Sequence, residues 1–156
     1  MATALQEPKF IPSTGGEAYW WAGGLAEILA TPEDTNGGFT LVAITVQPGF
    51  ATPLHIHHDE DEGFYILEGS ATFTVGDEVI EAGVGDYAYG PRDIKHMLEA
   101  GPEGCKMLYL FTPGGFEGFI RAAGVRAPRR EAPDPQDVDV ERLVAAAPQY
   151  GLELLG

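Results

Sequence analysis

The sequence predicts an all-β domain that is followed by a short helical tail. Between residues 19 and 112, short runs rich in β-branched and aromatic residues alternate with turns of Gly, Pro, Asn and Asp. Runs of this length and spacing are typical of an antiparallel sandwich or barrel. After Pro113, apolar residues recur at helical spacing instead. The 156 residues fit one domain, with an arm at 1–18, a core at 19–112 and a helical tail at 113–156.

The first elements are an arm and a hairpin. Residues 1–18 carry several turn formers and predict an arm with short extended pieces. The run AYWWAGGLAEILAT at 18–31 indicates one or two strands, whose aromatic rings we expect to be core or dimer contacts. The turn TPEDTNGG at 31–38 connects it to a buried strand at 39–46, so a hairpin follows.

The middle of the chain predicts a series of further strands. An extended PLHIHH at 53–58 and FYILEG at 64–69 flank a short polar segment, which is the pattern of a tight hairpin connection. Strands follow at 70–75, at 79–82 and as YAY before Pro91, with Gly-rich turns between them. KHMLEA and CKMLYLFTP predict two more strands, separated by the turn residues GPEG.

The tail predicts two short helices. In PGGFEGFIRAAG, Phe116, Phe119 and Ile120 fall at i, i+3 and i+4, which indicates one helical face. RAPRREAPDPQ is a connector rich in proline and charge. A second helix is expected to begin near Asp139 and to end before Pro148.

The composition argues against several classes of partner. With 24 acidic and 9 basic residues, the formal charge of −15 repels nucleic-acid phosphates and anionic membranes. Cys105 is the only cysteine, which rules out an intrachain disulfide and fits a reducing compartment. The chain shows neither a signal-peptide pattern nor an apolar run approaching the ~18 residues of a membrane span. We therefore expect a cytoplasmic protein without nucleic-acid or membrane partners.

Three potential metal ligands lie close together in the sequence. His55 and His57 alternate with one residue between them, so in an extended strand both imidazoles point the same way. In a four-residue hairpin, His57 and Glu62 become cross-strand neighbours with β-carbons roughly 5 Å apart. All three side chains can then reach one ion. The alternative is that the histidines are only packed strand residues.

The acidic residues between the two strands have a second interpretation. His58, Asp59, Glu60 and Asp61 could raise the local affinity for a cation, but a solvated hairpin tip is the favoured reading. Asp61 is the nearest rival to Glu62 as the carboxylate ligand. We favour Glu62, because it is in phase with Phe64 and Ile66 on one strand face.

The spacing of these residues resembles the first motif of the cupin superfamily. Gly49, five residues, His55, one residue, His57, four residues, Glu62, six residues and Gly69 match that motif at each defined position. Together with the second motif described next, this resemblance favours metal binding over accidental clustering of histidines.

The second cupin motif is matched less completely. Fifteen residues separate Gly69 from Gly85, which is followed by five residues, Pro91 and then His96. The family prefers Gly where this chain has Asp93 and Asn where it has Ala100. These departures affect the expected turn more than they affect His96, because Asp tolerates turn conformations well.

The resemblance implies a double-stranded β-helix, the jelly-roll cupin barrel, with a metal ion inside it. The ligands it implies are His55, His57, Glu62 and His96. Imidazole and carboxylate ligands suit one divalent transition metal ion, which could be Fe, Ni, Co, Mn or Zn, and the ligand set does not name the ion.

A closer resemblance, to one group within the superfamily, is carried by the segments YWWAGGLAEILAT, PLHIHHDEDEGFYILEG, PGGFEGFIRAAG and QYGLELLG. These are similar to small bacterial monocupins grouped with quercetin dioxygenases. The resemblance implies a metal-dependent dioxygenase that acts on a flavonol-like or other enolisable aromatic molecule, with Glu62 accepting the hydroxyl proton. The alternatives are a non-redox isomerase or polyketide-type cyclase, and a non-catalytic ligand-binding cupin.

Aromatic and aliphatic residues near the two motifs are candidates for the apolar walls of a substrate pocket. They are Phe39, Phe64, Met97, Leu98, Phe111, Phe116 and Phe119, with the last two as a cap. The arm, an exposed sheet edge and the family resemblance also favour a homodimer.

Overall fold

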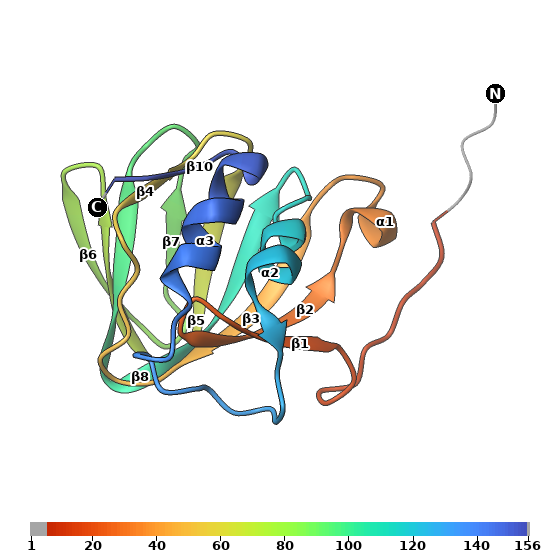
Figure 1. The fold of residues 1–156 in the computed structure, drawn as a ribbon, viewed down its shortest axis with the longest axis horizontal. Coiled ribbons are helices and arrows are strands. Elements are labelled where there is room, and N and C mark those ends of the chain that lie inside the picture. Colours follow the sequence, from red (N-terminus) through yellow and green to blue (C-terminus); the bar gives the residue numbers. More distant parts are fainter. Residues whose placement is uncertain (1–5, 156) are drawn as a thin grey trace.

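The computed structural model describes residues 6–155 and confirms an all-β body with helices in the tail (Figure 1). In chain order, the elements are β1 (Glu17–Trp21), β2 (Gly24–Ala30), α1 (Pro32–Thr35), β3 (Thr40–Val46), β4 (His55–His57), β5 (Asp61–Val75), β6 (Glu78–Gly83), β7 (Tyr87–Gly90), β8 (His96–Thr112), α2 (Glu117–Ala123), β9 (Val125–Arg126), α3 (Val140–Ala146), a 3-10 turn at Ala147–Tyr150, and β10 (Leu152–Leu154).

Two long strands, β5 and β8, organise the jelly roll. Along the path β10-β4-β8-β3-β2-β1-β9, each strand pairs with the next, while β5 pairs with β6, β7 and β8. The second half of β8 lies between β3 and β5, and its first half pairs with the end of β5. All these pairings are antiparallel, which agrees with the architecture that the short runs predicted.

The prediction that Gly69 and GPEG separate shorter strands was wrong, because β5 and β8 each continue through these residues. The strands bend there instead: the register of β5 against β8 shifts between Ile66 and Glu68 and between Gly69 and Ala71. Gly69 has a φ of +72°, and a Cβ at this position would collide with the carbonyl of Gly104. Glycine therefore permits a close approach of two bent strands rather than a strand end.

The hairpin expected near the N-terminus is confirmed as β2 and β3, with Leu25 opposite Thr45. Its connection is more ordered than a simple turn, because residues 32–35 form the helical turn α1. The backbone N–H of Thr31 donates to Asp34 Oδ2 at 3.0 Å, and Asn36 ends the helix in a left-handed conformation. These are the cap interactions that Thr, Asp and Asn favour.

The tight hairpin expected between residues 57 and 62 was wrong. The neighbours of β4 are β10 and, through His55 opposite His96, β8. Glu62 lies opposite Gly90 of β7 and Phe111 of β8 instead. The polar segment 58–60 thus carries the chain from one part of the sheet to another and does not join paired strands.

The tail contains both predicted helices and two strands that the sequence did not indicate. Figure 1 shows α2 and α3 lying side by side over one face of the sheet, with β10 running beside β4. Residues Phe116, Phe119 and Ile120 are buried, as the helical spacing predicted. Since β9 has two residues and β10 has three, both are too short for a periodic signal.

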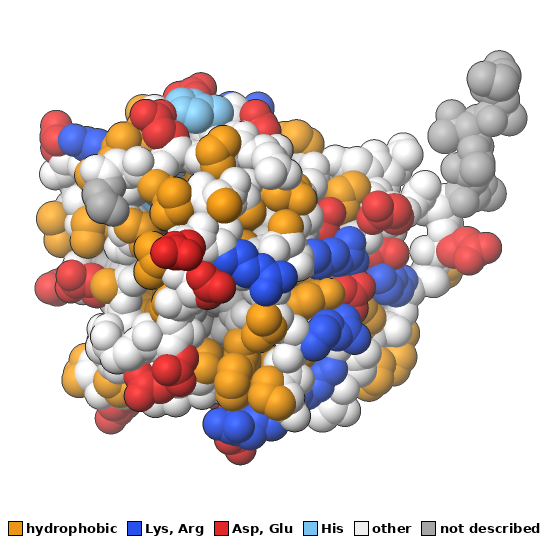
Figure 2. Space-filling model, in the orientation of Figure 1, with side chains coloured by type: hydrophobic (Ala, Val, Ile, Leu, Met, Phe, Trp, Pro, Cys, Tyr) orange, Lys and Arg blue, Asp and Glu red, His pale blue; other side chains and the backbone are white. Residues whose placement is uncertain are grey.

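Arginines attach the tail to the body of the sheet. Five of the nine basic residues fall within 121–142. Arg121 pairs with Glu17 at 2.9 Å, and Arg130 pairs with Glu27 at 2.8 Å. Figure 2 shows Lys and Arg side chains gathered in one area of the face drawn there. The charges of the tail therefore complement acidic groups of β1 and β2.

The core fills the space between the bent strands and α2. The largest fully buried side chains include Ile44, Phe64, Ile66, Phe73, Leu98, Met107, Phe111, Phe119 and Ile120. Cys105 is buried among them, as expected of a core residue. Within residues 6–155, no helix has the length and apolar character needed to cross a membrane.

Candidate metal centre

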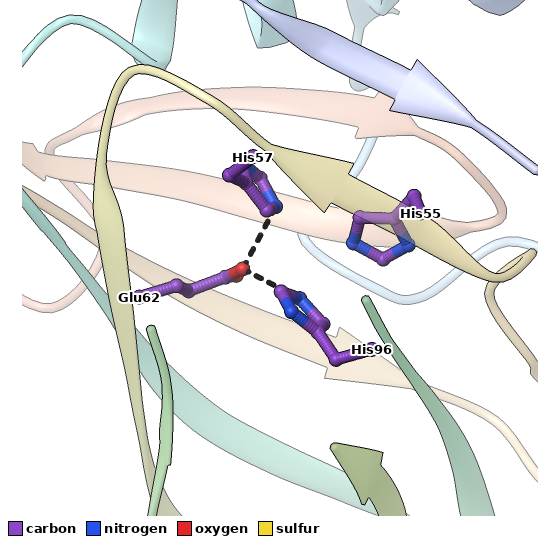
Figure 3. Close-up of side chains that lie close together, drawn as sticks. All are labelled: His55, His57, Glu62 and His96. Carbon is purple, nitrogen blue, oxygen red and sulfur yellow. Dashed lines mark hydrogen bonds and ion pairs between the residues drawn. The ribbon is translucent and has the colours of Figure 1, made fainter. Parts of the chain in front are cut away.

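The barrel interior brings together the four residues of the two motifs. His55 and His57 come from β4, Glu62 is the second residue of the long strand β5, and His96 begins β8 (Figure 3). Alternation along β4 points both imidazoles inward, and alternation along β5 puts Glu62 on the same face as the buried Phe64. One donor atom from each of the four lies within 4.8 Å of the other three.

Glu62 lies at the centre of this cluster. Its Oε2 atom is 2.9 Å from His57 Nε2 and accepts a hydrogen bond from His96 Nε2 at 3.1 Å. The rings of His57 and His96 stack with their centroids 5.2 Å apart, and the ring of His55 meets that of His96 edge-on at 4.4 Å. The three histidines thus converge from different directions on one carboxylate.

The outer nitrogens of the histidines have different surroundings. His55 Nδ1 donates to the carbonyl of Pro53 at 2.7 Å, and His57 Nδ1 donates to Glu60 Oε1 at 2.9 Å. His96 Nδ1 is buried and has no hydrogen-bond partner among residues 6–155. The two bonded Nδ1 atoms must carry protons, since both partners are acceptors, and this leaves the Nε2 atoms to act as donors to a metal.

Burial and mutual charge shift the pKa values of the cluster. Burial, with the neighbouring His96 and His57, lowers the pKa of His55 to about 4. Burial also lowers the pKa of His57, but the carboxylates of Glu62 and Glu60 outweigh it and raise that pKa to about 9. Burial raises the pKa of Glu62, yet His57 and His96 hold it well below its usual range. Glu62 is therefore a carboxylate at neutral pH.

The four side chains fit a divalent transition metal ion. Donors on opposite sides of an ion with bonds of ~2.1 Å lie ~4.2 Å apart, so a cluster spanning at most 4.8 Å needs little rearrangement. His57 Nε2 is buried and makes no hydrogen bond of good geometry. A bound ion would give this nitrogen a partner. Three imidazoles and one carboxylate suit Fe, Co, Ni, Mn or Zn and do not distinguish among them.

The remaining residues of the polar segment have separate roles. His58 is exposed and lies between Asp93, at 2.7 Å, and Glu153, at 2.8 Å. Asp61, the rival of Glu62, pairs with Arg92 at 3.0 Å and does not belong to the cluster.

Glu60 contradicts the expectation of a solvated tip. Its side chain is 5% exposed, and its carboxylate lies against the ring of His57. The sequence could not show this, because an acidic residue in a polar run carries no signal of burial. The expectation held for the exposed residues His58 and Asp59.

A cavity of about 460 Å³ opens onto this cluster. His55, His57 and Glu62 line it, whereas His96 is buried beside them without lining it. The volume lies in the range of small-molecule sites. The walls are mainly apolar, and the only formally charged side chain among the described lining residues, apart from the histidines, is Glu62.

Four of the seven predicted wall residues line this cavity: Phe64, Leu98, Phe116 and Phe119. The other three do not. Phe39 is 36% exposed, Met97 is half-buried, and Phe111 is fully buried behind the wall, stacked on Phe116 at 4.3 Å. Contact of the four lining residues with a substrate stays a prediction.

Several wall residues were not foreseen. They come from β1, β8 and the tail, and include Trp21, Tyr109, Gln136, Val138, Leu143, Leu152 and Leu154. Trp21 packs edge-on against Phe116 and Phe119, at 5.7 and 5.8 Å. In the sequence, only the alternation of Leu152 and Leu154 could have indicated a strand with an apolar face, and a segment of three residues is too short for that inference.

Comparison with known proteins agrees with the fold and the cluster. Residues 42–111 match the family model described as Cupin domain. The chain is 29% identical over 117 residues to quercetin 2,3-dioxygenase of Bacillus subtilis, covering 75% of this chain and 35% of that protein. It is 35% identical over 80 residues to oxalate decarboxylase of Bacillus subtilis, covering 48% of this chain and 20% of that protein.

Solved structures show the same fold. KdgF from Halomonas sp. matches with a TM-score of 0.64 and 18% identity, over 72% of this chain and 99% of that one. An oxalate decarboxylase variant from Bacillus subtilis matches with a TM-score of 0.63 and 28% identity, over 76% of this chain and 33% of that one. The matched part of the chain thus spans 35% of the length of quercetin 2,3-dioxygenase of Bacillus subtilis. The jelly roll, the two motifs and these matches together show a cupin domain at residues 42–111.

Proposed function

We propose that this cupin is a metal-dependent dioxygenase that acts on a flavonol-like or other enolisable aromatic molecule. The observation that carries the proposal is the apolar, aromatic-walled cavity whose polar end is the His and Glu cluster. The similarity to quercetin 2,3-dioxygenase supports the reaction class, although it extends over 35% of that protein. The arrangement suits a flat apolar molecule that carries one ionisable hydroxyl.

The walls favour a substrate without permanent negative charge. Among the described lining residues there is no Lys or Arg to pair with an extra carboxylate, and the chain carries a formal charge of −15. A polyanionic substrate would be repelled and poorly neutralised. Phe64, Phe116 and Phe119 offer ring faces and edges to an aromatic substrate instead.

Glu62 is the residue that we assign to proton transfer. Its carboxylate lines the cavity, so its oxygens can accept the proton of a substrate hydroxyl that is bound there. His55 and His57 line the same cavity and would hold the ion beside that hydroxyl oxygen. When bound by the cluster, a divalent ion would supply Lewis-acid polarisation of this oxygen and, if redox-active, a route for electrons to dioxygen.

The walls also exclude water from the reacting groups. Trp21, Phe116 and Phe119 pack edge to face, with centroids 5.5 to 5.8 Å apart, between the sheet and α2. A substrate that fills this space would displace water and strengthen the electrostatic interactions at Glu62.

The direct test is dioxygen uptake by protein loaded separately with Fe, Co, Ni or Mn, using quercetin as the probe. We expect uptake that requires both quercetin and the ion, and that is lost in His57→Ala. Absence of uptake with all four ions would refute the dioxygenase. Quercetin consumption without oxygen, with Zn as the ion, would point instead to a non-redox isomerase or cyclase.

We further propose that the protein works in the cytoplasm as a homodimer. Among residues 6–155, β6 pairs with β5 alone, which leaves a sheet edge for a second copy. Light scattering after size exclusion should then give about twice the chain mass of 16.7 kDa, and a mass of one chain would reject the dimer.

A further inference from the structure

Glu60 is a buried carboxylate that lies outside the group of four candidate ligands. It lies in the segment between β4 and β5, and its side chain is 5% exposed although its neighbours His58 and Asp59 are exposed. Its Oε1 atom accepts a hydrogen bond from His57 Nδ1 at 2.9 Å. Burying a carboxylate is costly unless hydrogen bonds or positive charge compensate it. This burial therefore indicates a stabilising partner in the site.

Two carboxylates flank the same imidazole ring. Glu60 lies at Nδ1 of His57, and Glu62 lies 2.9 Å from Nε2 on the other side. Because a carboxylate accepts hydrogen bonds and does not donate them when ionised, Glu60 requires the proton of His57 to stay on Nδ1. When the ring gives up its second proton to bind an ion, the lone pair belongs to Nε2, which faces the centre of the cluster.

The backbone holds Glu60 in this inward position. The N–H of His58 donates to the carbonyl of Gly151 at 2.8 Å, and the N–H of Asp93 donates to the carbonyl of His57 at 2.8 Å. These bonds fix the start of the segment independently of the Glu60 side chain. A substitution at residue 60 therefore tests the carboxylate rather than the path of the chain.

We propose that Glu60 is a positioning residue of the metal centre, acting through His57. It orients the ring, selects Nε2 as the donor and strengthens that donor with its charge. Together with Glu62, it supplies two negative charges, which balance a divalent ion in a buried site. His55 differs because its Nδ1 meets a neutral carbonyl, and His96 differs because its Nδ1 meets no partner among residues 6–155. The proposal rests on the metal centre and does not depend on the reaction that is catalysed.

The test compares Glu60→Ala and Glu60→Gln with wild type and with Asp59→Asn, a control that removes a charge from the same segment at an exposed position. Affinity for Co²⁺ is measured by competition with a chelator, and the geometry of the site by the visible absorption of bound Co²⁺. We expect Glu60→Ala to lose roughly 10–100-fold in affinity, the usual effect of removing such a partner, and to change the spectrum. Glu60→Gln, which keeps an acceptor without the charge, should fall between Glu60→Ala and wild type.

The outcomes separate this proposal from the metal centre itself. Wild-type affinity and spectrum in both Glu60 variants would overturn the positioning role. If Glu60→Ala fails to fold, Glu60→Gln decides alone: weaker binding than in Asp59→Asn supports the role, and equal binding refutes it. If the wild-type protein binds no Co²⁺, the metal centre fails, and the role of Glu60 fails with it. Loss of quercetin turnover with intact Co²⁺ binding bears only on the proposed reaction.

Discussion

The adjacent histidines His57 and His58 have opposite surroundings, the first at the end of β4 and the second just after it. His57 is 3% exposed and faces Glu62, whereas His58 is exposed and pairs with Asp93 and Glu153. We expect His57→Ala to lose the stoichiometric ion, because it removes one of the four candidate ligands. His58→Ala should retain it, since exposed ion pairs contribute only about 0–1 kcal/mol. Elemental analysis of both purified variants measures the difference, and equal metal content would contradict the assignment.

Cys105 should be chemically silent in the folded protein. Its side chain is 4% exposed, and burial raises the pKa of the thiol to about 11. At pH 8 the group is therefore protonated, and the thiolate that reacts with disulfide reagents is scarce. We expect no measurable labelling of the native protein at pH 8 and one equivalent after unfolding in urea. Rapid labelling without urea would show that β8 opens readily around this residue.

Individual residues show what sequence spacing can and cannot reveal about a site. The spacing of His55, His57 and Glu62 was sufficient to predict one cluster, because it resembles a motif whose residues lie together in the folded protein. The reason given from geometry was nevertheless wrong: Glu62 reaches His57 across the barrel interior and not across a hairpin. The burial of Glu60 was beyond prediction, since it depends on contacts made after the whole barrel has formed.

At the scale of elements, α2 is tied to β3 through a buried polar contact. Thr40 Oγ1 donates to Glu117 Oε1 at 2.7 Å and accepts from the N–H of Gly115 at 3.0 Å. Both side chains are buried, and α2 carries Phe116 and Phe119 into the cavity wall. This contact therefore links the packing of a helix to the shape of the cavity.

Thr40→Val should destabilise the protein by about 1–3 kcal/mol, because it leaves the buried Glu117 carboxylate without its hydroxyl partner. Thr40→Ser keeps the hydroxyl and loses one methyl group, which costs about 1 kcal/mol. Urea unfolding monitored by tryptophan fluorescence gives both values. A valine variant as stable as the serine variant would show that the hydrogen bond contributes little.

The elements that the sequence predicted well are those with a long periodic signal. The buried strand at residues 39–46 and the helical face of Phe116, Phe119 and Ile120 are examples. The elements it missed are fixed by tertiary context. Some glycines that indicate turns when the sequence is considered alone lie inside β5 and β8. They have no Cβ, and this allows the two bent strands to approach closely. The strand β10 exists because β4 offers it an edge.

At the scale of the whole molecule, an ion bound at the cluster would join the neighbouring strands β4 and β5 to β8, which begins about 35 residues later. A ligand that binds only the folded state raises the free energy of unfolding by about 2.7 kcal/mol when its concentration is 100 times Kd. For a domain of this size we therefore expect the melting temperature to rise by roughly 5–10 °C. Thermal scans with chelator and with saturating Co²⁺ measure the shift, which should vanish in His57→Ala. A shift of equal size in that variant would place the ion elsewhere.

The pairing of β10 with β4 has a consequence for biosynthesis. Leu152 lies opposite His57, and roughly 95 residues separate the two along the chain, which a ribosome adding about 5–20 residues per second needs about 5–20 s to make. During that interval the strand that carries two of the histidines lacks its outer neighbour, and the cavity lacks the wall formed by Leu152 and Leu154. A nascent chain consequently offers an ion an incomplete and water-filled site. Tight metal loading should follow translation of the last strand rather than accompany that of the first motif.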